Sequence, residues 1–210
     1  DQAGFSRGVV IMNNEASLSK NLTQAFGEDR FERNGEPFAL RVFPDGSEPV
    51  EKCVAMIGTV DDNLVVRAAA YDSFLHNNAV IDNEKTWLLG DVIEFFVQAP
   101  GHEDYYEFHV TPEAKRLQLH LLDYRTIKQV PWEEKLVDVG LNVRSSVFEG
   151  VWVSEMRLPF AAIGIASIRG IRYAVCRYNY PQAGDPECSS SMLTDKIYGF
   201  HNPPVWECVY

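Results

Sequence analysis

The chain has 210 residues, which fits a single domain, and 46% of them are apolar, enough for a hydrophobic core. Its formal net charge of −11 argues against binding nucleic acid or an anionic membrane surface, because both require clustered cations. No apolar run reaches the roughly 18 to 20 residues that span a bilayer, so membrane insertion is not expected.

One short helix is predicted at the start of the chain, over residues 15–27, before a long series of strands. From there apolar and polar residues alternate between turns rich in Gly, Pro, Asn and Asp, a pattern typical of β-strands. The expected strands cover residues 37–43, 52–60, 63–71, 91–98, 104–111, 116–121, 136–143, 150–158, 170–179 and 205–209. One helical turn is expected over 159–166, after Pro159.

About ten short strands without a sustained 3.6-residue period predict an all-β fold, an antiparallel, jelly-roll-like β-sandwich with under about 15% helix. No repeat or linker divides the sequence, so residues 1–210 are expected to form one domain. Two long polar segments separate the strands, at 72–90, which carries Trp87, and at 181–204. Because binding residues concentrate on such loops, we expect the ligand site there.

Polar residues on the predicted strands define a candidate ligand floor. Glu94 shares one face of its strand with Phe96, and Glu107 shares a face of the next strand with His109. If these strands pair, the polar residues form one cluster, with Arg177 as its cationic partner. A floor that binds hydroxyl groups and a buried Glu94–Arg177 pair that satisfies itself both fit this pattern.

Paired carboxylates also raise the question of glycoside hydrolysis, which needs two carboxyl groups about 5 to 10 Å apart. Asp91 and Glu94 are three residues apart on one strand and point to opposite faces, whereas a Glu94–Glu107 pair stays open. No motif of another hydrolase class is present. The five histidines lack metal-ligand spacing and are expected as single surface residues. The chain is therefore expected not to be an enzyme.

Oxygen-rich turns are the candidates for a structural calcium ion, because calcium prefers carboxylate and carbonyl oxygens. They carry Asp61, Asp62, Asp72 and Asp82, and simple solvated turns are the alternative. Four cysteines permit two disulfides. Cys188 and Cys208 lie near turns and are the candidate pair, whereas Cys53 and Cys176 lie in strands and fit buried thiols equally well.

Several motifs occur in an order that resembles the family 9 carbohydrate-binding modules, over about residues 37–210. Trp87-Leu-Leu-Gly-Asp91-Val-Ile-Glu94-Phe-Phe resembles the family's central motif, a tryptophan followed by Asp-x-x-Glu and two hydrophobic residues. Residues 105–110, 150–160, 171–179 and 200–209 resemble later motifs. The spacing from Trp87 to Asp91 is one residue longer than in the family, and Phe200 replaces the last-loop tryptophan.

The resemblance implies a non-catalytic, secreted, periplasmic or cell-surface domain that grips a mono-, oligo- or polysaccharide end between aromatic rings, often with structural calcium. The ligand-binding residues that it implies, together with the strand pattern, are Trp87, Phe200, Glu94, Glu107, His109, Arg177 and Asn202. The departures leave open a structural cell-surface module that has lost sugar binding. A haem-binding electron-transfer sandwich, with Met192 and either His76 or His201 as axial ligands, is a further alternative. The start at Asp1 fits a mature secreted protein and equally a trimmed chain.

Overall fold

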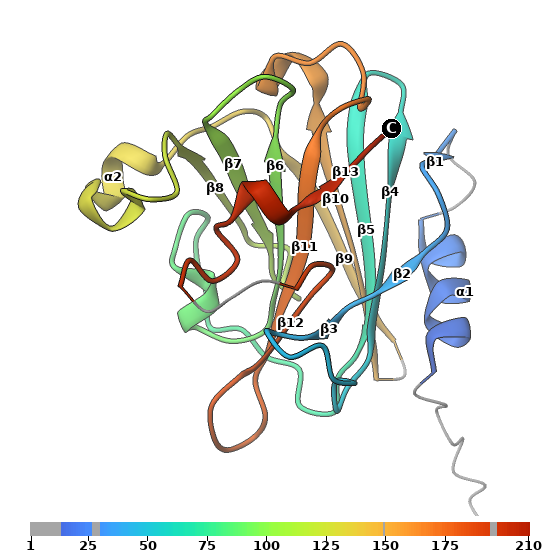
Figure 1. Ribbon diagram of the computed structural model, residues 1–210. Coiled ribbons are helices and arrows are strands. Elements are labelled where there is room, and N and C mark those ends of the chain that lie inside the picture. Colours follow the sequence, from blue (N-terminus) through green and yellow to red (C-terminus); the bar gives the residue numbers. More distant parts are fainter. Residues whose placement is uncertain (1–13, 27–29, 149, 194–196) are drawn as a thin grey trace, which may run out of the picture.

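The computed structural model describes residues 14–26, 30–148, 150–193 and 197–210. They form a sandwich of two antiparallel β-sheets (Figure 1). Helix makes up 14% of the chain. The prediction of an all-β sandwich with little helix is therefore confirmed.

Sheet A has the strand order β1-β4-β5-β10-β9, with β2 also paired to β4. Its strands are β1 (Glu32–Arg33), β2 (Phe38–Ala39), β4 (Cys53–Val60), β5 (Asn63–Tyr71), β9 (Asn142–Phe148) and β10 (Val151–Pro159). Alternation along β5 places Leu64, Val66, Ala68 and Ala70 in the core between the sheets. The opposite face of β5 contacts the helix α1 (Glu15–Ala25), through Ala69 and Tyr71. Sheet A is therefore covered on both faces.

Sheet B has the order β3-β12-β11-β6-β7-β8, with β13 also paired to β11. Its strands are β3 (Arg41–Val42), β6 (Val92–Gln98), β7 (Tyr105–Val110), β8 (Arg116–Leu121), β11 (Arg172–Asn179), β12 (Glu187–Ser190) and β13 (Glu207–Cys208). Phe95 and Phe108 point into the core between the sheets. Phe96, Tyr105 and Leu119 belong to a second apolar cluster on the outer face of sheet B.

Short helical turns lie in the connections. They are η1 (Thr86–Leu88), η2 (Ile127–Gln129), α2 (Trp132–Lys135), η3 (Phe160–Ile163) and η4 (Pro203–Val205). In Figure 1, α1 lies beside β4 and β5, whereas α2 lies at the other side of the molecule, beside β8. The expected helix near residues 15–27 and the turn after Pro159 are both confirmed.

Three of the expectations about the fold differ from the structure. The strand expected at 136–143 begins only at Asn142, because residues 136–141 make a single bridge from Leu136 to Leu119. The segment expected as a loop at 181–204 contains β12, whose Glu-Cys-Ser-Ser sequence lacks an apolar alternation and is held by pairing with β11 and β3.

The candidate disulfide between Cys188 and Cys208 is the third expectation that differs from the structure, because both thiols are free. Cys188 lies opposite Tyr178 and Cys208 opposite Arg172, at the two ends of β11. Six residues of strand span about 20 Å, far beyond the reach of one disulfide.

Among the described residues, no helix is long and apolar enough to cross a membrane.

Candidate functional site

A pocket of about 830 Å³ opens on the outer face of sheet B. Glu94 and Glu107, from neighbouring strands, line its floor. Three connections form its walls: the η1 segment, the segment from β8 to α2, and residues 197–201 before η4. The pocket therefore lies where the outer-face apolar cluster of sheet B meets the loops that cover it.

His109 joins the two carboxylates of the floor. Its side chain is completely buried, and its Nε2 lies 2.7 Å from Glu107 Oε1 and 3.2 Å from Glu94 Oε1. Its Nδ1 lies 2.7 Å from the hydroxyl of Thr86. The strand register explains this cluster, because Glu94 pairs directly with His109. The expectation that His109 is a surface residue is therefore wrong, and its expected place beside Glu107 is where the structure puts it.

Burial and neighbouring charges shift the pKa values of Glu94 and Glu107 in opposite directions. Burial, together with the charge of Glu107, raises the pKa of Glu94 to about 8, against the opposing effect of His109. Burial also acts to raise the pKa of Glu107, but His201, the hydrogen bond from His109 and Lys135 hold it below the usual range. The pKa of His109 is raised, because the two carboxylates outweigh its burial. At neutral pH a pKa of about 8 keeps Glu94 largely protonated, beside the hydrogen-bonded pair of His109 and Glu107.

One carboxylate oxygen of Glu107 lacks a hydrogen-bond donor among the described residues. Its Oε2 is buried and accepts no hydrogen bond from the described residues. The ring nitrogen Nδ1 of His201 is 3.8 Å from this oxygen and lies 2.9 Å from the hydroxyl of Tyr105. A buried acceptor without a donor is costly, so this oxygen is suited to a donor that a ligand brings.

Two tryptophans form an aromatic wall above this floor. The ring centroids of Trp87 and Trp132 are 5.6 Å apart, and Trp87 is also 5.6 Å from the His109 ring. Tyr180 donates a 2.6 Å hydrogen bond from its hydroxyl to the carbonyl of Trp87. The side chain of Trp87 is half-buried, and the hydrogen bond from Tyr180, directly after β11, holds its backbone in place.

Trp132 is a pocket residue that the sequence analysis missed. It begins α2, directly after Pro131, in a segment between two predicted strands to which no element was assigned. A proline followed by helix-forming Glu, Glu and Lys is a recognisable helix start, and an unassigned loop tryptophan was the available signal.

Phe200 and Asn202 differ in their place relative to the pocket. Phe200 lines it but is only 6% exposed, because Phe43, Phe96 and Tyr178 surround its ring at centroid distances of 4.9 to 6.3 Å. Asn202 is buried directly before η4, outside the set of residues that line the pocket. Trp87 and Trp132 therefore offer more ring surface than Phe200.

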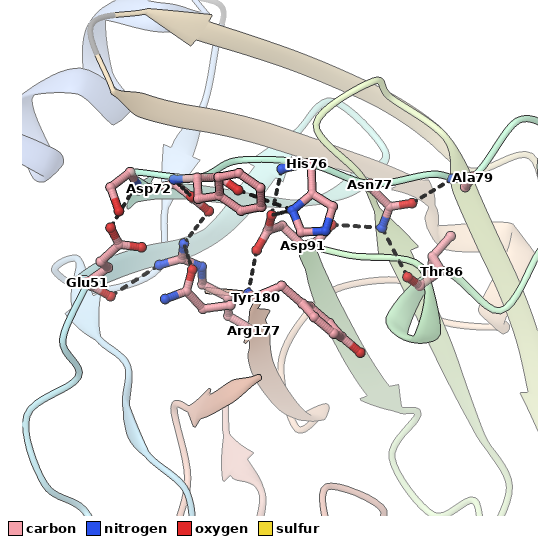
Figure 2. A network of polar contacts seen from close by, with 12 residues as sticks. Glu51, Asp72, His76, Asn77, Ala79, Thr86, Asp91, Arg177 and Tyr180 are labelled. Carbon is pink, nitrogen blue, oxygen red and sulfur yellow. Dashed lines mark hydrogen bonds and ion pairs between the residues drawn. The ribbon is translucent and has the colours of Figure 1, made fainter. Parts of the chain in front are cut away.

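Arg177 does not join the floor, so its expected pairing with Glu94 is wrong. It lies opposite Ile93 on β6 and so faces the interior of the sandwich, whereas Glu94 faces outward. Its guanidinium donates a 2.8 Å bond to Asp72 Oδ2 and bonds of 2.9 and 3.1 Å to the carbonyls of Tyr71 and Glu51 (Figure 2).

Asp91 and Asn77 extend this polar network to Thr86, which contacts His109 in the pocket floor. Asp91 accepts hydrogen bonds of 2.7 Å from the backbone N–H groups of His76 and Tyr180. The amide of Asn77 donates to the carbonyls of Asp91 and Thr86, both at 3.0 Å (Figure 2). Because the Thr86 hydroxyl contacts His109, these bonds position both η1 and the floor. Asp91 and Glu94 point to opposite faces, as predicted.

The four expected calcium ligands lie at three separate places, with only Asp61 and Asp62 at the same turn. Asp61 is 3.8 Å from Arg30, Asp82 bonds Arg116 at 3.0 Å, and Asp72 bonds Arg177. Asp62, at the same turn as Asp61, is exposed and accepts a backbone bond from Phe160 through its carbonyl. Glu94, Glu107 and His109 are the described group whose donor atoms lie within 4.8 Å of one another. Calcium stays a prediction, which melting curves with and without a chelator test.

No protein-family model and no curated protein sequence matches this chain. Among solved structures, it is similar to a candidate carbohydrate-binding protein from Bacteroides uniformis, with a TM-score of 0.65, 16% identity, and coverage of 81% of this chain and 84% of that one.

Two structures of a family 9 carbohydrate-binding module from Caldicellulosiruptor kristjanssonii are also similar. The complex with cellotriose has a TM-score of 0.57, 12% identity, and coverage of 90% and 85% of the two chains. The complex with glucose has a TM-score of 0.55, 11% identity, and coverage of 80% and 81%. The chain therefore has the fold of the family 9 carbohydrate-binding modules.

Proposed function

We propose that this chain is a non-catalytic domain that binds a saccharide in the pocket on the outer face of sheet B. The observation that carries the proposal is the free carboxylate oxygen of Glu107, buried beneath the wall formed by Trp87 and Trp132. A sugar has an apolar C–H face that packs on aromatic rings, and a rim of hydroxyl groups that donate to carboxylates. The similar family 9 module is described in complexes with cellotriose and glucose, which supports this ligand class.

Each floor residue has a definite role in this proposal. Glu107 accepts a hydroxyl hydrogen through Oε2, and protonated Glu94 supplies a neutral donor or acceptor. His109 holds both carboxyl groups in place. Trp87 provides the stacking surface, with Trp132 beside it, and Phe200 closes the end of the pocket.

The arrangement of the two glutamates supports binding rather than hydrolysis. A glycosidase places its two carboxyl groups on either side of the scissile bond. Here both carboxyl groups contact the same nitrogen, His109 Nε2, which occupies the space between them. From the similarity to carbohydrate-binding modules we further propose that the domain acts outside the cytoplasm by attaching a protein to glycans.

The experiment is isothermal titration calorimetry with sugars selected from a glycan array that contains neutral and acidic members. We expect Trp87→Ala to weaken binding about tenfold or more, since a stacked ring contributes roughly 1 to 3 kcal/mol. Leu88→Ala is the matched control, because Leu88 follows Trp87, is 62% exposed and is absent from the pocket lining.

An array without any bound glycan, from protein that is folded by circular dichroism, would contradict the proposal. Equal losses for Trp87→Ala and Leu88→Ala would place the site elsewhere. Release of product from chromogenic glycosides would show an enzyme, and a Soret absorption band in the purified protein would favour the haem alternative.

A further inference from the structure

The charge around the pocket is opposite to that of the protein as a whole. The chain has 30 acidic and 19 basic residues. Four cations line the pocket, against the two floor carboxylates. These cations are Lys85, Arg125, Lys128 and Lys135. A basic pocket in an acidic protein concentrates anions at that one place.

Three of these cations make no direct ion pair among the described residues. Arg125 is paired with Asp123 at 2.8 Å. Lys85, Lys128 and Lys135 form no ion pair within the part of the chain that the structure describes. The Lys85 ammonium instead lies 5.0 Å from the centre of the Trp132 ring, beside the aromatic wall.

The two carboxyl groups of the floor are fewer than the four cations of the walls. Both carboxyl groups turn toward His109, and a pKa of about 8 keeps Glu94 largely protonated at neutral pH. Lys135 is close enough to this floor that its charge lowers the pKa of both Glu107 and His201. The pocket thus combines a hydrogen-bonding floor with cations along its walls.

We propose that the ligand of this pocket is an anionic saccharide, whose ring packs on Trp87 while its acidic group lies against Lys85, Lys128 and Lys135. This inference rests on the proposed function and narrows its substrate class. The shared chemistry is a sugar that carries a carboxylate, as in a uronic acid, or a sulfate ester. An ammonium forms strong charge-assisted hydrogen bonds with either group.

The test compares sugars that differ only in the acidic group. Calorimetry at low salt measures glucose against glucuronate, galactose against galacturonate, and glucose against glucose 6-sulfate. We expect an acidic sugar to bind roughly tenfold or more tightly than its neutral counterpart, as a hydrogen bond to a charged group contributes more than a neutral one. Its affinity should fall with added salt, while that of the neutral sugar stays constant.

Variants then assign the preference to the pocket. Lys85→Gln with Lys128→Gln should reduce the affinity for the acidic sugar roughly three- to tenfold, and should change the affinity for the neutral sugar much less. Lys20→Gln is the matched control for a lost charge, because Lys20 is exposed on α1, which covers sheet A.

The outcomes separate this inference from the function on which it depends. Equal binding of neutral and acidic sugars, or a preference for the neutral ones, overturns the anionic ligand and leaves saccharide binding intact. Binding of neither kind, by folded protein, overturns the proposed function itself. Preference for the carboxylate or the sulfate decides between the two sources of negative charge. An unchanged preference in the double lysine variant also overturns the inference.

Discussion

Glu94 and Glu107 are the same residue type on neighbouring strands, and their surroundings give them different protonation. Both are buried, but Glu107 receives the shorter bond from His109, and the pKa of Glu107 is also lowered by His201 and Lys135. Glu94 lies farther from His109 and is also repelled by Glu107. The pattern of alternation predicted that both residues share a face, whereas which of them holds a proton depends on ångström-scale geometry.

This difference predicts how stability depends on pH. Burial raises the pKa of Glu94 from 4.5 to about 8, so the folded protein holds a proton that the unfolded chain has released across that window. The contribution of Glu94 to the free energy of unfolding therefore decreases as pH rises from about 4.5 to 8. Glu94→Gln, which mimics the protonated acid, should match the parent at pH 5 and be more stable at pH 9, on the order of a few kcal/mol.

Urea unfolding at the two pH values measures this effect. Glu84→Gln is a control, because Glu84 lies outside the floor and its carboxylate caps the N–H groups of Val80 and Ile81. A constant difference between parent and Glu94→Gln at both pH values would show that Glu94 is ionised in the folded state.

At the scale of elements, the loop from Asp72 to Gly90 determines where Trp87 lies. Alternation ends at β5 and resumes at β6, so the sequence predicted a loop, and its tryptophan suggested a ligand wall. The path of that loop is set by contacts distant in sequence, including the bridge between Asn77 and Gly90 and the bond from Tyr180 to Trp87. Such contacts do not appear in a local pattern.

Gly90→Ala tests this dependence. Gly90 has φ +142°, a region unfavourable for other residues, and an added Cβ would collide with the His76 carbonyl and lie 2.7 Å from Asn77 Cα. We expect the variant to lose at least about 1 kcal/mol of stability and to bind sugar more weakly, because Trp87 moves with the loop. Gly101→Ala, with φ +78° and nothing within 4 Å, is the control, and only the first variant should lose affinity. Full affinity in Gly90→Ala would show that the wall does not depend on this turn.

At the scale of the whole molecule, Arg177 connects the two sheets through buried hydrogen bonds. It belongs to β11 of sheet B, and its partners Tyr71 and Asp72 lie at the end of β5 in sheet A. Burial raises the pKa of Asp72 to about 6, against the lowering effect of Arg177. Without the guanidinium, Asp72 and two backbone carbonyls would lose their shared donor.

Arg177→Met should therefore cost about 3 to 5 kcal/mol in chemical unfolding, the usual penalty for removing one member of a buried ion pair. Arg169→Met, at an exposed arginine, should cost little. At temperatures where Arg177→Met is still folded, its sugar affinity should equal that of the parent. A loss of affinity without a loss of stability would instead support the original expectation that Arg177 contacts the ligand.

The sequence by itself determined the sandwich, most of its strands, the loop that carries Trp87 and the shared faces of Glu94 with Phe96 and of Glu107 with His109. These features follow from the period of two along a strand, a local property that the chain carries wherever it folds. Tertiary structure alone decided the short strand β12, the position of Trp132 beside Trp87, the separation of Cys188 from Cys208 and the turn of Arg177 away from Glu94. Each of these depends on which strand pairs with which, and on how loops far apart in the chain meet over one sheet face, so no local pattern specifies them.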